Sequence, residues 1–164
     1  MMSVGDVIRW DPDRARVISE PRARQYLTDT GIPVSTILFE AERLTSRTFA
    51  ANTGQNFVRI GSFDDDFHFF LGVDSGSVYF GVDEDEEPAF GNSRLSDFVE
   101  CILWVEREFP FYSIDDETSK KREAGLRVSD FLRSTDPICL DMQGGFWMQF
   151  VHDVEIGDYY EGSL

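Results

Sequence analysis

Residues 57–82 read FVRIGSFDDDFHFFLGVDSGSVYFGV, and this stretch decides the fold. It contains runs rich in β-branched and aromatic residues at 57–61, 67–73 and 78–82. The last two runs flank Asp74-Ser75-Gly76-Ser77, and β-rich runs on either side of a Ser-Gly turn indicate a hairpin. We therefore predict three consecutive strands in an antiparallel meander.

The aromatic residues of the middle run are predicted to lie on both faces of this sheet. Side chains alternate along a strand, so Phe67 and Phe69 share one face while His68 and Phe70 share the other. Such a density of rings is compatible with a ligand pocket or a stacking platform. We prefer a strand core, with protein covering both faces, because sheets select aromatic and β-branched residues.

Apolar residues recur at spacings of three and four in the second half of the chain, which predicts amphipathic helices. The predicted helices cover residues 95–109, 117–132 and 146–154, although the last segment is also compatible with a strand. In the first half, acid and Pro at a first turn predict a short helix over 20–29. A short strand is expected at 37–39.

The order of elements predicts an α+β fold, with a single-layer antiparallel sheet packed against N-terminal and C-terminal helices. Asn92 and Ser93 are expected to cap the helix that follows them. The length of 164 residues fits one domain over 1–164, with 1–19 as a loosely ordered N-terminal extension.

Charge excludes several classes of partner. The chain has 15 Lys and Arg against 31 Asp and Glu, so its formal charge is −16. Phosphates and anionic lipids are held by basic residues, which argues against direct binding to nucleic acid or to a membrane surface. No apolar stretch approaches the roughly 18 residues of a membrane span, and the start lacks the pattern of a secretory signal. We expect a cytoplasmic protein.

The excess of acid is confined to part of the chain. Residues 1–50 carry seven basic and seven acidic side chains, whereas residues 51–164 carry eight and 24. Runs at 64–66, 83–87 and 115–117 fall between hydrophobic segments and are predicted to be loops. They either keep the protein soluble or form a docking face that steers a basic partner. The residues predicted to bind that partner are Asp64, Asp65, Asp66, Asp83, Glu84, Asp85, Glu86 and Glu87.

Signatures of catalysis and of metal binding are missing from the sequence. His68 and His152 are the only histidines, and neither zinc nor EF-hand spacing occurs. Glycine-rich phosphate loops and the GxSxG nucleophile motif are also absent. We predict no catalytic residues, no metal and no cofactor. For Cys101 and Cys139, two buried free thiols are preferred over a disulfide.

Several short motifs, taken in order, resemble the SUKH superfamily. They are Gly31-Ile32-Pro33, Phe57-Val58-Arg59-Ile60-Gly61, the hairpin from Leu71 to Tyr79, the helix start from Phe90 to Phe98, and finally Phe146-Trp147 with Gly157. The resemblance spans residues 20–160 and is nearest to the fourth subgroup, the SUKH immunity proteins. Arg94 departs from the second Ser of that family's N-S-S-L pattern, and the run at 83–87 replaces a shorter, less charged connection.

The resemblance implies a non-enzymatic α+β domain. Bacterial members are encoded beside polymorphic toxins, many of them nucleases or nucleic-acid deaminases, and neutralise them by binding. We therefore expect an immunity protein that is a monomer or a weak homo-oligomer and binds a basic toxin domain. Two alternatives stay open: a scaffold or regulatory interaction domain without a toxin, and a small-ligand-binding domain or enzyme. The motif positions Gly61, Gly76, Asn92, Ser93 and Leu95 fit turn, cap and core roles.

Overall fold

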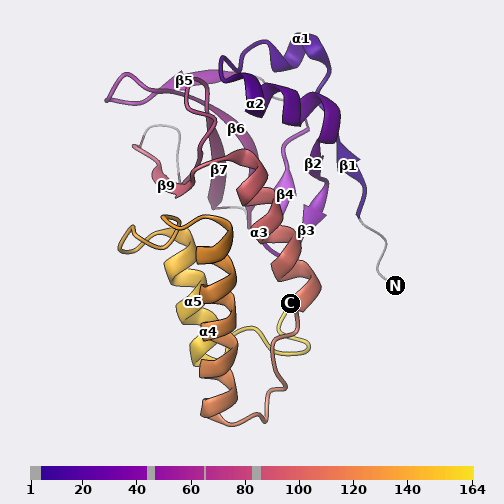
Figure 1. Cartoon of the computed structure of the whole chain (residues 1–164), viewed down its shortest axis with the longest axis vertical. Coiled ribbons are helices and arrows are strands. Elements are labelled where there is room, and N and C mark those ends of the chain that lie inside the picture. Colours follow the sequence, from indigo (N-terminus) through magenta and orange to yellow (C-terminus); the bar gives the residue numbers. More distant parts are fainter. Residues whose placement is uncertain (1–4, 44–46, 65, 83–85) are drawn as a thin grey trace.

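The computed structural model describes residues 5–43, 47–64, 66–82 and 86–164, and it confirms the predicted α+β class. Helices pack against an antiparallel sheet (Figure 1). In chain order the elements are β1 (Val7–Ile8), α1 (Pro12–Ala15), α2 (Pro21–Gln25), the π-helical turn η1 (Tyr26–Thr30), β2 (Ile32–Pro33), β3 (Ser35–Thr36), β4 (Phe39–Ala41), β5 (Thr48–Ala50), β6 (Asn56–Phe63), β7 (Phe67–Gly72), β8 (Val78–Gly81), β9 (Ala89–Asn92), α3 (Leu95–Glu108), α4 (Thr118–Thr135) and α5 (Phe146–Ile156).

The main sheet contains the predicted meander. Its strand order is β3-β4-β6-β7-β8-β9, all neighbours are antiparallel, and β5 also pairs with β6. In the β7–β8 hairpin Phe69 lies opposite Phe80 and Phe70 lies opposite Tyr79. Strand β9 extends the meander beyond the three strands that the sequence predicted. The strand expected at 37–39 forms two residues later, as β4.

Both faces of the meander are covered around the middle of β7, as predicted. Phe69 packs against Phe98 of α3, with ring centroids 4.9 Å apart. On the opposite face, Phe70 meets Phe49 of β5 at 5.0 Å. Both β7 side chains are fully buried. Period-two alternation therefore places neighbouring phenylalanines in two different layers of packing.

Helices α4 and α5 form a helical hairpin below the sheet in Figure 1. Helices α4 and α5 run antiparallel and pack closely, since Gly125 leaves room for the Glu155 side chain. The segment that was ambiguous between helix and strand is the helix α5, which ends at Gly157 in a left-handed conformation. No helix of the described residues is long and apolar enough to cross a membrane.

Three buried side chains anchor residues 5–19, part of the segment 1–19 that the sequence predicted to be a loosely ordered extension. Trp10, Ala15 and Ile18 belong to the buried core, and Trp10 is only 2% exposed. The Trp10 amide donates to the Leu27 carbonyl at 2.9 Å, and the Arg14 guanidinium lies 4.0 Å from the Trp10 ring centroid. Burial of the large indole ties this segment to η1, which compensates for its lack of long helices or strands.

Both cysteines are buried and free, as predicted. Burial is the main reason that the pKa of Cys139 rises to about 12, and it also raises the pKa of Cys101. Since the thiolate is the reactive form, we expect neither native thiol to react with Ellman's reagent at mildly alkaline pH. Titration should find both thiols once the chain is unfolded in guanidinium. Rapid reaction of the native chain would contradict this prediction.

Candidate functional site

Two of the three acidic runs lie on turns and connections of the sheet, and the run at 115–117 lies between α3 and α4. Asp64 and Asp66 are exposed at the β6–β7 turn, where Asp64 has a left-handed backbone with φ of 53°. Glu86 and Glu87 are exposed in the β8–β9 connection. The predicted site residues outside the described part of the chain are Asp65, Asp83, Glu84 and Asp85.

Both ends of the β8–β9 connection lie at the end of the sheet that carries the β6–β7 turn, because Gly81 lies opposite His68 and Ala89 lies opposite Phe80. Asp64 and Asp66 lie in the β6–β7 turn at that same end. The Glu87 side chain also bonds to the turn between β5 and β6, where it accepts a hydrogen bond from Thr53 Oγ1 at 2.9 Å.

An aromatic recess lies beside the β6–β7 turn. Strands β6, β7 and β8 contribute one phenylalanine each, and α5 contributes residues spaced i, i+3, i+4 and i+7, which share one helix face. The recess has a volume of about 160 Å³. Its lining residues are Phe63, Phe67, Phe80, Phe146, Gln149, Phe150, Asp153 and Tyr159.

The rings of the aromatic recess form a continuous set of contacts. Phe67 and Phe80 stack with centroids 5.2 Å apart and planes inclined by 21°. Phe80 meets Phe146 of α5 at 5.0 Å. The three strand phenylalanines, Phe63 included, are only partly buried, so ring surface is exposed to solvent here.

Negative charge surrounds this recess. Partial burial, and then the charge of Asp158, raise the pKa of the Asp153 carboxyl, although His152 acts in the opposite sense. Burial, followed by Asp153, Asp64 and Asp158, raises the pKa of the Tyr159 hydroxyl. Within the described residues, the Asp153 carboxylate has no hydrogen bond or ion pair. An ionised Asp153 at this position would be stabilised by an added cation.

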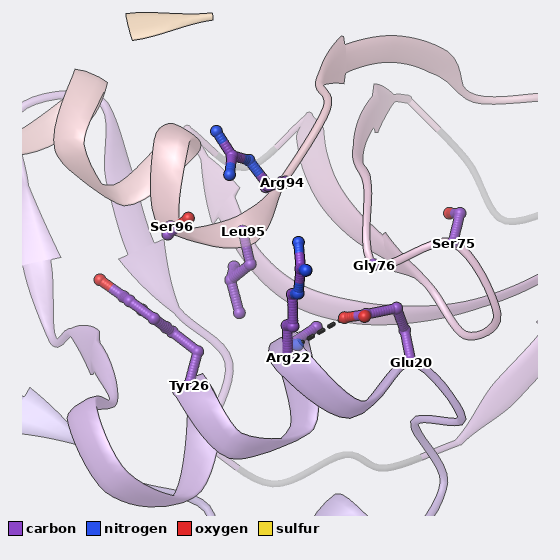
Figure 2. Close-up of a pocket in the computed structure, with 9 residues that line it drawn as sticks. Glu20, Arg22, Tyr26, Ser75, Gly76, Arg94, Leu95 and Ser96 are labelled. Carbon is purple, nitrogen blue, oxygen red and sulfur yellow. Dashed lines mark hydrogen bonds between the residues drawn. The ribbon is translucent and has the colours of Figure 1, made fainter.

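A second recess, shown in Figure 2, has basic residues in its lining. It has a volume of about 260 Å³ between α2, the β7–β8 turn and the start of α3. Arg22 and Arg94 line it together with Glu20. The Glu20 carboxylate is already used, because it accepts the Ala23 amide at 2.6 Å and caps α2. Arg94 pairs with Asp97 at 2.9 Å.

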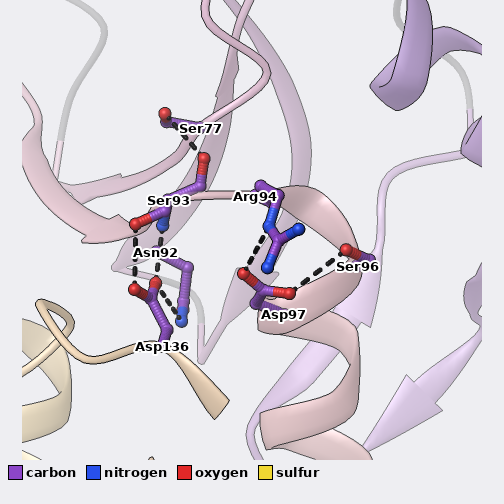
Figure 3. A network of polar contacts seen from close by, with 7 residues as sticks. All are labelled: Ser77, Asn92, Ser93, Arg94, Ser96, Asp97 and Asp136. Carbon is purple, nitrogen blue, oxygen red and sulfur yellow. Dashed lines mark hydrogen bonds and ion pairs between the residues drawn. The ribbon is translucent and has the colours of Figure 1, made fainter. Parts of the chain in front are cut away.

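Asn92 and Ser93 do not cap α3, and this corrects the sequence prediction. Arg94 is the N-cap residue, without a capping side-chain bond, and Asn92 belongs to β9. Figure 3 shows both predicted cap residues bonded to Asp136 at the end of α4. Ser93 donates to Asp136 through its amide at 2.6 Å and through its hydroxyl at 2.8 Å, and Asn92 Nδ2 donates at 3.2 Å. Asn92 Oδ1 accepts the Trp147 indole N–H at 2.7 Å.

This Asp136 network gives the Asn92-Ser93 pair a structural role rather than a role in binding. Asp136 is 2% exposed and Asn92 is fully buried, so their polar atoms cannot be reached by a partner. The network joins β9, the end of α4 and the start of α5. Its role is to hold the helical hairpin on the sheet.

The fold and its surface define an acidic α+β domain whose recesses lie at the junctions between sheet and helices. Among the described residues, no group of three or more His, Cys, Asp or Glu side chains could hold a metal ion. The chain belongs to the SUKH-4 immunity protein family, whose model matches residues 1–153. No curated protein and no solved structure matches the chain significantly.

Proposed function

We propose that this chain is the immunity protein of a bacterial polymorphic toxin system and neutralises its cognate toxin domain by binding it. The observation that carries the proposal is the family match over residues 1–153. A nuclease or a nucleic-acid deaminase is the toxin class that suits the charge. Such enzymes need a cationic cleft for their substrate, and the formal charge of −16 makes this chain a complementary partner.

We favour as the contact surface the end of the sheet that carries the β6–β7 turn. The β6–β7 turn carries Asp64 and Asp66 in exposed positions beside the half-buried rings of the aromatic recess. Aromatic residues at the centre of a contact, with charge around them, are the usual composition of a strong interface. The exposed Glu86 and Glu87 of the β8–β9 connection would add steering charge.

The test is binding to the product of the neighbouring toxin gene, measured by surface plasmon resonance at two ionic strengths. Lowering the ionic strength from roughly 0.15 to 0.01 M lengthens the Debye length from about 8 to 30 Å, which strengthens steering. Replacing the three aspartates at 64–66 by asparagine should then slow association roughly tenfold at low salt. The dissociation rate should change less.

A matched control removes the same charge elsewhere. Glu123→Gln, Asp130→Asn and Asp141→Asn change three exposed side chains in or after α4. This triple variant should associate at close to the wild-type rate. Absence of toxin binding would overturn the proposed function. If the toxin binds with an association rate that neither salt nor the 64–66 substitutions change, the electrostatic contact surface is overturned and the immunity function stands.

A further inference from the structure

The aromatic recess combines exposed rings with carboxylates. Phe63, Phe67 and Phe80 keep part of their ring surface in solvent on one wall. The α5 wall carries the Asp153 carboxylate, which has no hydrogen-bond or ion-pair partner within the described part of the chain. Exposed apolar surface that is rimmed by polar groups commonly marks an interaction site.

The volume of the recess limits what it can hold. A cavity of about 150 Å³ is enough for a benzene molecule. The recess, at about 160 Å³, therefore has room for one planar group of that size. It is too small for a nucleotide or for a peptide segment with several side chains, so a partner would insert a single side chain.

Charge decides the chemistry of that side chain. Asp153 lines the recess, and Asp64 and Asp158 raise the pKa of the Tyr159 hydroxyl in the same wall, so the electrostatic potential there favours a cation. In the described part of the chain, His152 is the basic group that lowers the pKa of Asp153, and its side chain is exposed. A cation above ring faces gains cation–π attraction, and a carboxylate adds a charge-assisted hydrogen bond.

We propose that the aromatic recess receives an arginine side chain of the protein partner, with the guanidinium over the Phe67–Phe80 pair and hydrogen-bonded to Asp153. Arginine fits better than lysine, because its planar group stacks on rings and pairs with a carboxylate through two parallel bonds. Gln149, one turn before Asp153, adds an amide oxygen that can accept a further N–H. The proposal rests on the proposed function, since the toxin is the source of the arginine.

The first experiment needs no toxin. The full ¹⁵N-labelled chain is titrated with the peptide acetyl-Gly-Arg-Gly-amide and followed by NMR. Its citrulline analogue, which has the same shape without the charge, is the matched probe. Arginine should bind in roughly the millimolar range, as expected for so small a ligand, and shift the amides of Phe67, Asp153 and Tyr159. The citrulline peptide should bind at least tenfold more weakly.

Two variants of the chain sharpen this test. Asp153→Asn should weaken arginine binding about tenfold and should fold normally, because partial burial already disfavours the charged carboxyl. Asp130→Asn removes an exposed charge on α4 and should leave binding unchanged. In the wild type, added arginine should lower the pKa of Asp153 measured from its carboxyl ¹³C shift. Equal binding of both peptides, or equal binding by wild type and Asp153→Asn, would overturn the proposal.

The second experiment uses the toxin and separates this inference from the proposed function. Asp153→Asn and Phe67→Ala should each weaken toxin binding about 30-fold, which is the loss expected at a central anchor. Circular dichroism confirms that each variant is folded. Toxin binding that is unchanged in both variants would overturn the arginine site and leave the immunity function intact. A chain that binds the arginine peptide but not the toxin would overturn the toxin as the source of the arginine, together with the proposed function.

Discussion

Replacing Asp136 by alanine should lower the free energy of unfolding by about 3–5 kcal/mol. The Asp136 carboxylate is 2% exposed and accepts three hydrogen bonds from Asn92 and Ser93. Alanine would leave the buried Asn92 amide and the partly buried Ser93 donors without an acceptor, and each unsatisfied buried group costs about 1–3 kcal/mol. A domain of this kind is stable by only about 5–15 kcal/mol in total, so a large part of the stability would be lost.

Thermal and urea unfolding followed by circular dichroism measure this effect, and the melting temperature should fall by roughly 6–20 °C. Asp136→Asn keeps one acceptor oxygen and should lose less. Asp130→Ala, at an exposed position on the same helix, should change stability by less than about 0.5 kcal/mol. Equal losses for Asp136→Ala and Asp130→Ala would show that the network does not hold the hairpin on the sheet.

The second large effect is expected for Gly31→Ala, with a loss of about 3–5 kcal/mol. Gly31 ends η1 with φ of 82° and ψ of 178°, a conformation that is nearly restricted to glycine. A Cβ atom there would also lie 2.5 Å from the Ile8 carbonyl oxygen. Strain and a clash with backbone therefore act together, and neither is relieved by moving a flexible side chain.

Two other glycines separate these causes. Gly54 has φ of 80° and open space around it, so Gly54→Ala measures conformational strain alone, about 1 kcal/mol. Gly61 has no positive φ, but a Cβ would contact the Phe39 ring and the Glu40 carbonyl. Gly61→Ala thus measures the clash, about 1–3 kcal/mol. Urea unfolding should show Gly31→Ala to be the least stable of the three variants. A loss of unfolding free energy for Gly31→Ala that is no larger than the loss for Gly54→Ala would contradict the combined effect.

Local patterns predicted the long elements and the short helix near 20–29, but they missed several of the short strands. Side-chain alternation predicts the meander β6–β8, and apolar residues at spacings of three and four predict the helices α3–α5. Both patterns depend only on neighbouring residues. Strand β9, with four residues, and β5, with three, carry too few residues for a period to show. Their conformation is set by pairing with β8 and β6, which is a contact between distant parts of the chain.

The candidate site was visible in fragments. The sequence showed the acidic turn at Asp64–Asp66 but gave no sign that Asp153 and Tyr159 surround the same recess. One signal could have found part of it. Phe146, Gln149, Phe150 and Asp153 occupy i, i+3, i+4 and i+7, which places an acid at the end of an aromatic helix face.

The sequence by itself determined the fold class, the meander, the excess of acid after residue 50 and the family resemblance that the family model confirms. These properties follow from composition, from local periodicity and from the order of short motifs. Only the tertiary structure decided that Asn92 and Ser93 bind Asp136, and that strand phenylalanines meet α5 beside the acidic turn. The physical reason is that periodicity fixes which face a side chain occupies, whereas its partner on that face depends on how distant elements pack.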